Sequence, residues 1–185
     1  AHPCLRGVAG WQRQMCLRDS YYIPTSYGGD PIRNPDAAPT GRNLIGFNPA
    51  KVPSKEAYDA GVILMNQTID AYVKKHGKFP EKLAFSLWSL ETMRHQGALE
   101  AQILHALGLK PKWNHQGHVV GTDVIPYSEL KRPRIDVVIS ATGLYRDAFP
   151  NVMLWIAKAI DKVAKMKEDN NFVYRHATAL KYELL

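Results

Sequence analysis

The chain has 185 residues, enough for one substantial domain with its own core, and its composition of 45% hydrophobic and 22% charged residues is ordinary for a globular protein. No apolar run approaches the roughly 20 residues of a membrane helix, and no signal-peptide pattern occurs at the start, so we expect no membrane span. The formal net charge of +7 suits an anionic partner, but the basic residues are scattered and no aromatic-plus-basic RNA motif occurs, so we expect no nucleic acid. Two cysteines are too few for a disulfide scaffold and indicate a reducing, cytoplasmic compartment.

Residues 1–53 contain seven of the twelve prolines together with many glycines and asparagines, which predicts an irregular N-terminal arm. A segment of this length without regular structure is uncommon unless it wraps a neighbour or carries a function. The chain starts with AHPCLRG, without a methionine, and ends with KYELL, so we expect a piece of a larger protein.

Regular secondary structure is expected from Pro53 onward. Ser54 can cap a helix that runs to His76, and Gly77 suits the position that follows a helix. Its inward stripe is predicted to contain Ala57, Ala60, Gly61, Leu64, Thr68 and Tyr72. A strand over 83–88 follows, and then a second helix over 90–107 that Gly108 ends.

Further strands are predicted over 112–114 and 118–126, separated by a turn at 115–117. The run IDVVIS at 135–140 is typical of a strand buried on both faces of a parallel sheet. A last long helix over 151–167 is predicted to turn Val152, Trp155, Ile156, Ala159 and Val163 inward. Strands that alternate with long helices predict an α/β domain over 54–185, a three-layer sandwich with a mainly parallel sheet.

Polar residues follow two of these strands, at positions where open α/β sheets bind ligands. The first group follows the strand over 83–88, and the second follows IDVVIS. If the two strands are neighbours, six residues would lie near one another: Glu91, Arg94, Thr142, Tyr145, Arg146 and Asp147. The alternative is that loops after strands are polar anyway, and that Arg146 and Asp147 form a local ion pair worth about 0–1 kcal/mol.

Metal ligation has only weak candidates in the sequence. Glu91 and His95 are four residues apart, a spacing that can hold a metal from one side of a helix, but a site needs a further ligand and a plain helix pair is the alternative. His115 and His118 form an HxxH pattern around a turn glycine, and loop histidines are usually exposed. The chain has no GxxxxGK[ST], GxGxxG or GxSxG motif, so any ATP chemistry would come from another chain.

Four stretches, in order, resemble the large subunits of cobalt and magnesium chelatases, the family of CobN and of the magnesium chelatase H subunit. They are PTGRNLIGFNPAKVPSKEAYDAG (39–61), SLWSLETMRHQGALEAQILHALGLKPKW (86–113), VIPYSELKRPRIDVVISATGLYRDAFPN (124–151) and NNFVYRHA (170–177). The blocks PTGRN, ELxRPRIDVV and GLxRDxFPN are specific in their order and spacing. Members of this family are far longer, so the chain would be an internal segment of such a large subunit.

The resemblance implies a tetrapyrrole-binding subunit that holds a corrin or porphyrin ring while a divalent metal, Co or Mg, is inserted. Partner subunits of the AAA+ ATPase type would hydrolyse the ATP. The roles that it suggests are proton transfer for Glu91, pairing with ring carboxylates for Arg94 and Arg146, and orientation of Arg146 for Asp147. Arg42 and Asn43 are expected as outer contributors and Thr142 as a further binding residue.

Trp88 and Tyr145 could pack on the ring face, although Trp88 is expected in the core. His95 is not carried over as a shared ligand, because histidine is not usual at its position in the family. Two alternatives remain: a CobN-like protein that handles haem or removes metal, and a non-catalytic scaffold that docks the ATPase partner. The isolated segment is expected to be inactive.

Overall fold

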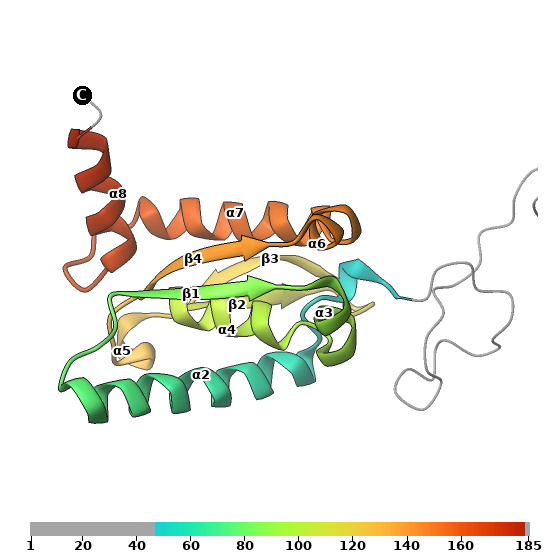
Figure 1. The fold of residues 1–185 in the computed structure, drawn as a ribbon, viewed down its shortest axis with the longest axis horizontal. Coiled ribbons are helices and arrows are strands. Elements are labelled where there is room, and N and C mark those ends of the chain that lie inside the picture. The colour runs from blue at the N-terminus through green and yellow to red at the C-terminus, as the bar shows by residue number, and fades with distance from the viewer. Residues whose placement is uncertain (1–46, 184–185) are drawn as a thin grey trace, which may run out of the picture. The chain divides into compact units, whose positions relative to one another are not determined.

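The computed structural model describes residues 47–183 (Figure 1). The chain divides after Asn48 into two units, and the second, Pro49–Leu185, carries all of the elements that follow. These elements are η3 (Pro49–Lys51), α2 (Lys55–His76), β1 (Lys82–Leu87), α3 (Ser89–His95), α4 (Ala98–Leu107), β2 (Leu109–Trp113), β3 (Val119–Val124), α5 (Tyr127–Leu130), β4 (Asp136–Ala141), α6 (Gly143–Ala148), α7 (Pro150–Ala164) and α8 (Phe172–Glu183). Most of the predicted arm, with Arg42 and Asn43, lies outside the described residues. No helix within 47–183 is long and apolar enough to cross a membrane.

Helix α2 begins and ends where the sequence predicts. The Ser54 Oγ accepts a hydrogen bond from the Ala57 backbone N–H at 3.1 Å, which satisfies one of the free donors of the first turn. Gly77 ends the helix in the left-handed conformation, with a φ of 70°, and its N–H donates to the Val73 carbonyl oxygen. Lysines in the last turn lie at the negative end of the helix dipole.

The buried stripe of α2 differs in part from the predicted one. It consists of Ala57, Gly61, Met65 and Ile69, spaced four residues apart, while Ala60, Leu64 and Thr68 are exposed and Tyr72 is half-buried. Gly61 lies at a close approach of α2 to α4, since a Cβ there would be 2.6 Å from the Ala101 Cβ. Close packing of the two helices therefore depends on this glycine.

Helix α4 is the central element of the unit. It contacts α2, α7, β1, β4 and β2, and it lies between α2 and α7 in Figure 1. Seven of its ten residues are buried, including the polar residues Glu100 and His105. On the α7 side the prediction is confirmed for the buried residues Val152, Ile156, Ala159 and Val163.

Strands β1 and β4 pair in parallel, with Lys82 beside Asp136 and Leu87 beside Ala141. Phe85 and Leu87 are buried against the helices, whereas Val138 is 49% exposed. Within the described residues the sheet of β1 and β4 is therefore covered on one face only. The prediction that IDVVIS is buried on both faces is not met by this part of the chain. The α/β class with a parallel sheet is confirmed.

The second strand pair is an antiparallel hairpin of β2 and β3. Its turn lies where the sequence predicts it, because the Asn114 Oδ1 accepts from the backbone N–H groups of Gln116 and His118 at 3.0 and 2.9 Å. Helix α8 was not predicted. It starts after Asn171, whose side chain amide donates to the carbonyl oxygens of Val163 and Met166.

The RPR sequence at 132–134, part of a block that carries the chelatase resemblance, has a structural role. The buried Arg132 guanidinium donates to the carbonyl oxygens of His105 and Ala106, in the last turn of α4. These carbonyls lie at the negative end of the helix dipole, where the His105 oxygen also accepts from the Gly108 N–H and the Ala106 oxygen from the Ile135 N–H. Burial, and then the charge of Arg134, lower the pKa of Arg132 to about 10.

Arg134 completes the same end of α4. Its guanidinium donates to the carbonyl oxygens of Leu107, Gly108 and Ile125 at 3.2, 2.8 and 2.9 Å, and it pairs with the Glu168 carboxylate at 2.7 Å. Gly108 has a φ of 74°, and a Cβ there would collide with this guanidinium. The glycine after α4 is thus required both by its backbone conformation and by the arginine beside it.

Candidate functional site

The carboxyl ends of β1 and β4 lie side by side, because the two strands are parallel and in register. Helix α3 follows β1 and helix α6 follows β4, and the two helices contact each other at one end of the unit (Figure 1). The Thr142 N–H donates to the Leu87 carbonyl oxygen at 3.2 Å across this edge. The two strands are therefore neighbours, which was the condition for the predicted residues to gather.

The charged residues of α3 form an exposed pair. The Arg94 Nη1 lies 3.1 Å from the Glu91 Oε1, and 72% of the Arg94 side chain is exposed. A surface pair of this kind contributes about 0–1 kcal/mol to stability, so a bound anion can compete for the arginine at little cost. Both side chains are accessible to a ligand.

The charged residues of α6 are more loosely associated. The Arg146 Nε lies 4.0 Å from the Asp147 Oδ1, and 73% of the Arg146 side chain is exposed. Thr142 caps this helix, since its Oγ1 accepts from the Tyr145 N–H at 3.3 Å. The hydroxyl of Thr142 is therefore engaged in holding α6, and the two charged side chains extend from its surface.

The two aromatic residues considered for the ring face, Tyr145 and Trp88, do not lie where the sequence predicts them. Tyr145 is fully buried, its ring lies 5.1 Å from the Phe149 ring, and its hydroxyl donates to the Glu100 Oε1 at 2.7 Å. Burial, and then the charge and hydrogen bond of Glu100, raise the pKa of Tyr145 well above its usual range. Its ring thus packs in the interior, where a ligand ring does not reach it. Trp88, expected in the core, is 58% exposed and donates through Nε1 to the Ser86 Oγ at 3.0 Å.

Apolar side chains are exposed on the same helices as the charged ones. Leu90 on α3 and Leu144 on α6 are each 72% exposed, and Met93 on α3 is also exposed. Together with the charged residues they define what we term the carboxyl-edge surface: Trp88, Leu90, Glu91, Met93, Arg94, Leu144, Arg146 and Asp147. These apolar side chains lie on two helices that contact each other, and exposed large apolar side chains on adjoining elements are typical of interaction sites.

His95 lies at a break in the helix predicted over 90–107. Gln96 and Gly97 have φ values of 52° and 93°, which ends α3 and lets α4 start in a new direction. The His95 Nδ1 accepts from the backbone N–H groups of Gly97 and Ala98 at 3.2 and 3.0 Å, so it caps α4. Glu91 pairs with Arg94, and the predicted Glu91–His95 pair does not form in this arrangement.

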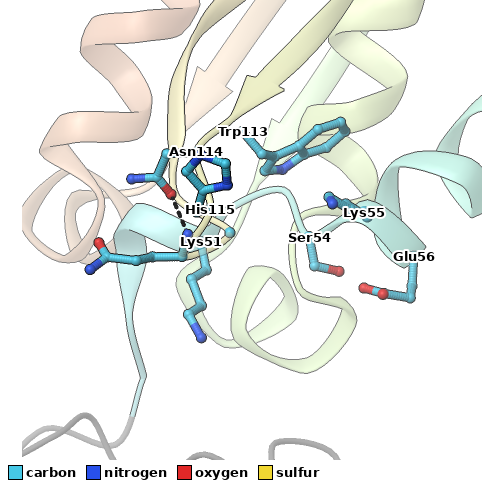
Figure 2. A pocket seen from close by; sticks show the side chains of 9 residues that line it. Lys51, Ser54, Lys55, Glu56, Trp113, Asn114 and His115 are labelled. Carbon is cyan, nitrogen blue, oxygen red and sulfur yellow. Dashed lines mark hydrogen bonds between the residues drawn. The ribbon is translucent and has the colours of Figure 1, made fainter.

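A cavity of about 600 Å³ lies between the start of α2 and the β2–β3 turn (Figure 2). Its lining includes Lys51, Lys55, Glu56, Trp113 and His115. It is open and of mixed charge, and none of the residues of the carboxyl-edge surface lines it. Of the predicted metal candidates only His115 borders it. Within residues 47–183, no three side chains of the His, Cys, Asp or Glu type gather closely enough to hold a metal.

Glu100 is the residue of this region that the sequence reasoning missed. Its side chain is fully buried, and its Oε1 accepts from the Thr92 Oγ1 at 2.8 Å and from the Tyr145 hydroxyl at 2.7 Å. Its Oε2 has no hydrogen-bond partner among the described residues. The available signal was the apolar composition around it, because a short helix that is apolar on all sides buries its polar residues as well.

Three comparisons with known proteins bear on this arrangement. The family model described as CobN/Magnesium Chelatase matches residues 17–185. The chain is 44% identical over 160 residues to an uncharacterized protein of Methanocaldococcus jannaschii. That match covers 85% of this chain and 13% of the archaeal protein. It is 36% identical over 180 residues to the magnesium-chelatase H subunit of Cereibacter sphaeroides. That match covers 96% of this chain and 14% of the H subunit.

The fold is also similar to a solved structure, the catalytic subunit of cobaltochelatase from Mycobacterium tuberculosis. The TM-score is 0.72 at 38% sequence identity, and the match covers 76% of this chain and 12% of the other. The chain thus spans between 12% and 14% of the length of these three proteins. The similarity concerns one segment of much longer chains.

Proposed function

Since this chain belongs to the CobN/magnesium chelatase family, we propose that it supplies part of the tetrapyrrole-binding surface of a chelatase large subunit. The whole subunit would hold a corrin or porphyrin ring while a divalent metal, Co or Mg, enters it as substrate. ATP would be hydrolysed by AAA+ partner subunits. The ring-binding surface in this chain would be the carboxyl-edge surface.

The observation that carries the proposal is the pairing of exposed apolar side chains with exposed arginines on α3 and α6. A tetrapyrrole is broad, flat and apolar, and it bears carboxylates at its periphery. Trp88, Leu90 and Leu144 offer apolar contact of the kind that a ring face needs. Arg94 and Arg146 can each bind a carboxylate in bidentate fashion.

The carboxylates of the same surface suit the chemistry of metal insertion. The ring must lose its inner N–H protons, and the hydrated metal must lose water. Glu91 is an exposed carboxylate that can take a proton, and it becomes free for this role when a ring carboxylate draws Arg94 away from it. Asp147 lies near Arg146 and would orient its guanidinium toward the ring.

Titration of the complete subunit with deuteroporphyrin IX, followed by absorbance, tests the proposal. Arg94→Ala and Arg146→Ala should each weaken binding by roughly five- to fiftyfold, the loss expected for one charge-assisted hydrogen-bonded contact. Glu91→Gln should retain binding and slow the insertion of Co²⁺ or Mg²⁺. Arg175→Ala is a matched control, because Arg175 is another exposed arginine paired with a carboxylate, Glu81, on a different part of the unit. Unchanged affinity in both test variants would refute the proposal.

A scaffold role is favoured by the same exposed apolar residues, which could dock an ATPase partner instead of a ring. In that case Leu90→Ser and Leu144→Ser would weaken binding of the ATPase partner and leave porphyrin affinity unchanged. The ring-binding proposal predicts the reverse. Measuring both affinities on the same two variants separates the two functions.

A further inference from the structure

Glu100 joins the two helices that carry the carboxyl-edge surface. It belongs to α4, and its Oε1 accepts one hydrogen bond from Thr92 on α3 and one from Tyr145 on α6. The two bonds are 2.8 and 2.7 Å long, and all three side chains are fully buried. A single carboxylate oxygen thus connects the helix after β1 to the helix after β4.

Each partner of Glu100 adjoins residues of the proposed ring site along the chain. Thr92 directly follows Glu91 and lies two positions before Arg94, and Tyr145 directly precedes Arg146. Rotation or displacement of α3 or α6 would stretch a buried hydrogen bond, which costs more than an exposed one because no water replaces the lost partner. The position of the two arginines relative to each other is therefore coupled to the carboxyl group of Glu100.

Stability alone does not account for a carboxyl group at this place. Its Oε2 is buried and lacks a partner among the described residues, and an unsatisfied buried oxygen destabilises the fold. An apolar side chain of similar shape on α4 would avoid this cost while filling the same volume. Such a side chain would lack the oxygen that accepts hydrogen bonds from both α3 and α6 and thereby sets their spacing.

We propose that Glu100 is a positioning residue, whose bonds to Thr92 and Tyr145 hold Arg94 and Arg146 at the separation that the carboxylates of a bound tetrapyrrole require. The inference rests on the proposed function, since it concerns the same surface. It assigns no contact between Glu100 and the ring. Glu100 acts only through the two helices.

Single-atom changes test this role with little risk to the fold. Tyr145→Phe and Thr92→Val remove one donor each while retaining the packing of the side chain. In the complete subunit, each should raise the Kd for deuteroporphyrin IX by about three- to tenfold, a range typical of coupled neighbouring groups. Glu100→Leu should combine both effects, and Glu100→Gln, which retains the acceptor oxygen, should restore the affinity to within about twofold of wild type.

A double-mutant cycle separates positioning from a general loss of stability. If Tyr145 acts through Arg146, Tyr145→Phe should have little further effect on the Kd once Arg146→Ala is present. Val163→Ala is the control, because it opens a cavity in the core at α7, away from the Glu100 cluster. Its effects on the Kd should be small and should add to those of Arg146→Ala, although it lowers the melting temperature.

The outcomes distinguish this inference from the proposed function. If Arg94→Ala and Arg146→Ala leave the Kd unchanged, the proposed ring site is wrong. If the arginine variants weaken binding while Tyr145→Phe, Thr92→Val and Glu100→Leu do not, the site stands and the positioning role of Glu100 is refuted. Additive effects in the Tyr145–Arg146 cycle would refute it as well.

Discussion

The guanidinium of Arg134 donates to the carbonyl oxygen of Gly108 at 2.8 Å, and this bond closes the end of α4 from inside the protein. The arginine is buried, satisfies two further carbonyl oxygens and pairs with Glu168. Charge, hydrogen bonding and the helix dipole thus act together at one residue. The central helix that supports the carboxyl-edge surface depends on it.

Replacement of Arg134 by methionine should reduce the free energy of unfolding by about 3–5 kcal/mol, because three carbonyl oxygens and the Glu168 carboxylate lose the guanidinium as a donor. Arg175→Met serves as the comparison, because Arg175 is an exposed arginine in a surface pair and should cost only about 0–1 kcal/mol. Urea denaturation of both variants measures the difference. Equal losses of unfolding free energy in the two variants would show that the buried contacts of Arg134 add no more stability than an exposed ion pair.

Gly61→Ala should destabilise the protein by about 1–3 kcal/mol, because the new Cβ would lie 2.6 Å from the Ala101 Cβ and 2.8 Å from the Ala98 carbonyl oxygen. The backbone oxygen cannot move aside without displacing α4. Gly121→Ala is the matched control, since nothing lies within 4 Å of a Cβ added there. A melting temperature that falls equally in both variants would contradict close packing of α2 on α4.

The stability of the fold should depend on pH through His105. Burial, and then the charge of Arg132, lower the pKa of His105 from 6.5 to about 4. Because the unfolded chain binds a proton at His105 more readily than the folded one, the free energy of unfolding is highest above pH 6.5 and falls as the pH is lowered from 6.5 toward 4. The free energy lost over this range is roughly 3 kcal/mol.

His105→Gln should flatten this part of the curve of unfolding free energy against pH. The wild-type Nε2 lies 2.9 Å from the Asn66 Oδ1, a contact that a glutamine amide can imitate. Denaturation midpoints between about pH 4 and pH 7 provide the measurement. A variant that retains the wild-type slope would assign the pH dependence to other groups.

His95 should behave as a helix cap and not as a metal ligand. His95→Ala should cost about 1 kcal/mol, since the N–H groups of Gly97 and Ala98 lose their acceptor, and His95→Asn should recover part of that loss. Binding of Co²⁺ to the complete subunit should be the same in both variants. A marked loss of Co²⁺ affinity in either variant would contradict the capping role.

Local signals in the sequence predicted helices α2 and α7 and the neighbouring strands β1 and β4. Ser54 and Gly77 carry the hydrogen-bonding and backbone preferences that start and end a helix, and these preferences do not depend on the rest of the fold. The turn at Asn114 is of the same kind. Such elements are readable because the residues that determine them are adjacent in the chain.

The site was harder to predict because it depends on where α3 stops. Gln96 and Gly97 end α3 after two turns, and α4 then starts anew with Glu100 in the core. A continuous helix over 90–107 gives no reason to place a glutamate in the core. The burial of Tyr145 likewise follows from its partner Glu100, forty-five positions away in the chain, which no local pattern reveals.

The central claim is that Arg94 and Arg146 recognise the carboxylates of a tetrapyrrole, and a comparison of two ligands tests it most directly. The Kd of the complete subunit is measured for deuteroporphyrin IX and for the same ring with both carboxylates converted to amides. Wild-type protein should prefer the acid, and the Arg94→Ala/Arg146→Ala variant should bind both rings with similar affinity. If the double variant keeps the full wild-type preference for the acid, Arg94 and Arg146 do not bind the ring carboxylates, and the proposed ring site is contradicted.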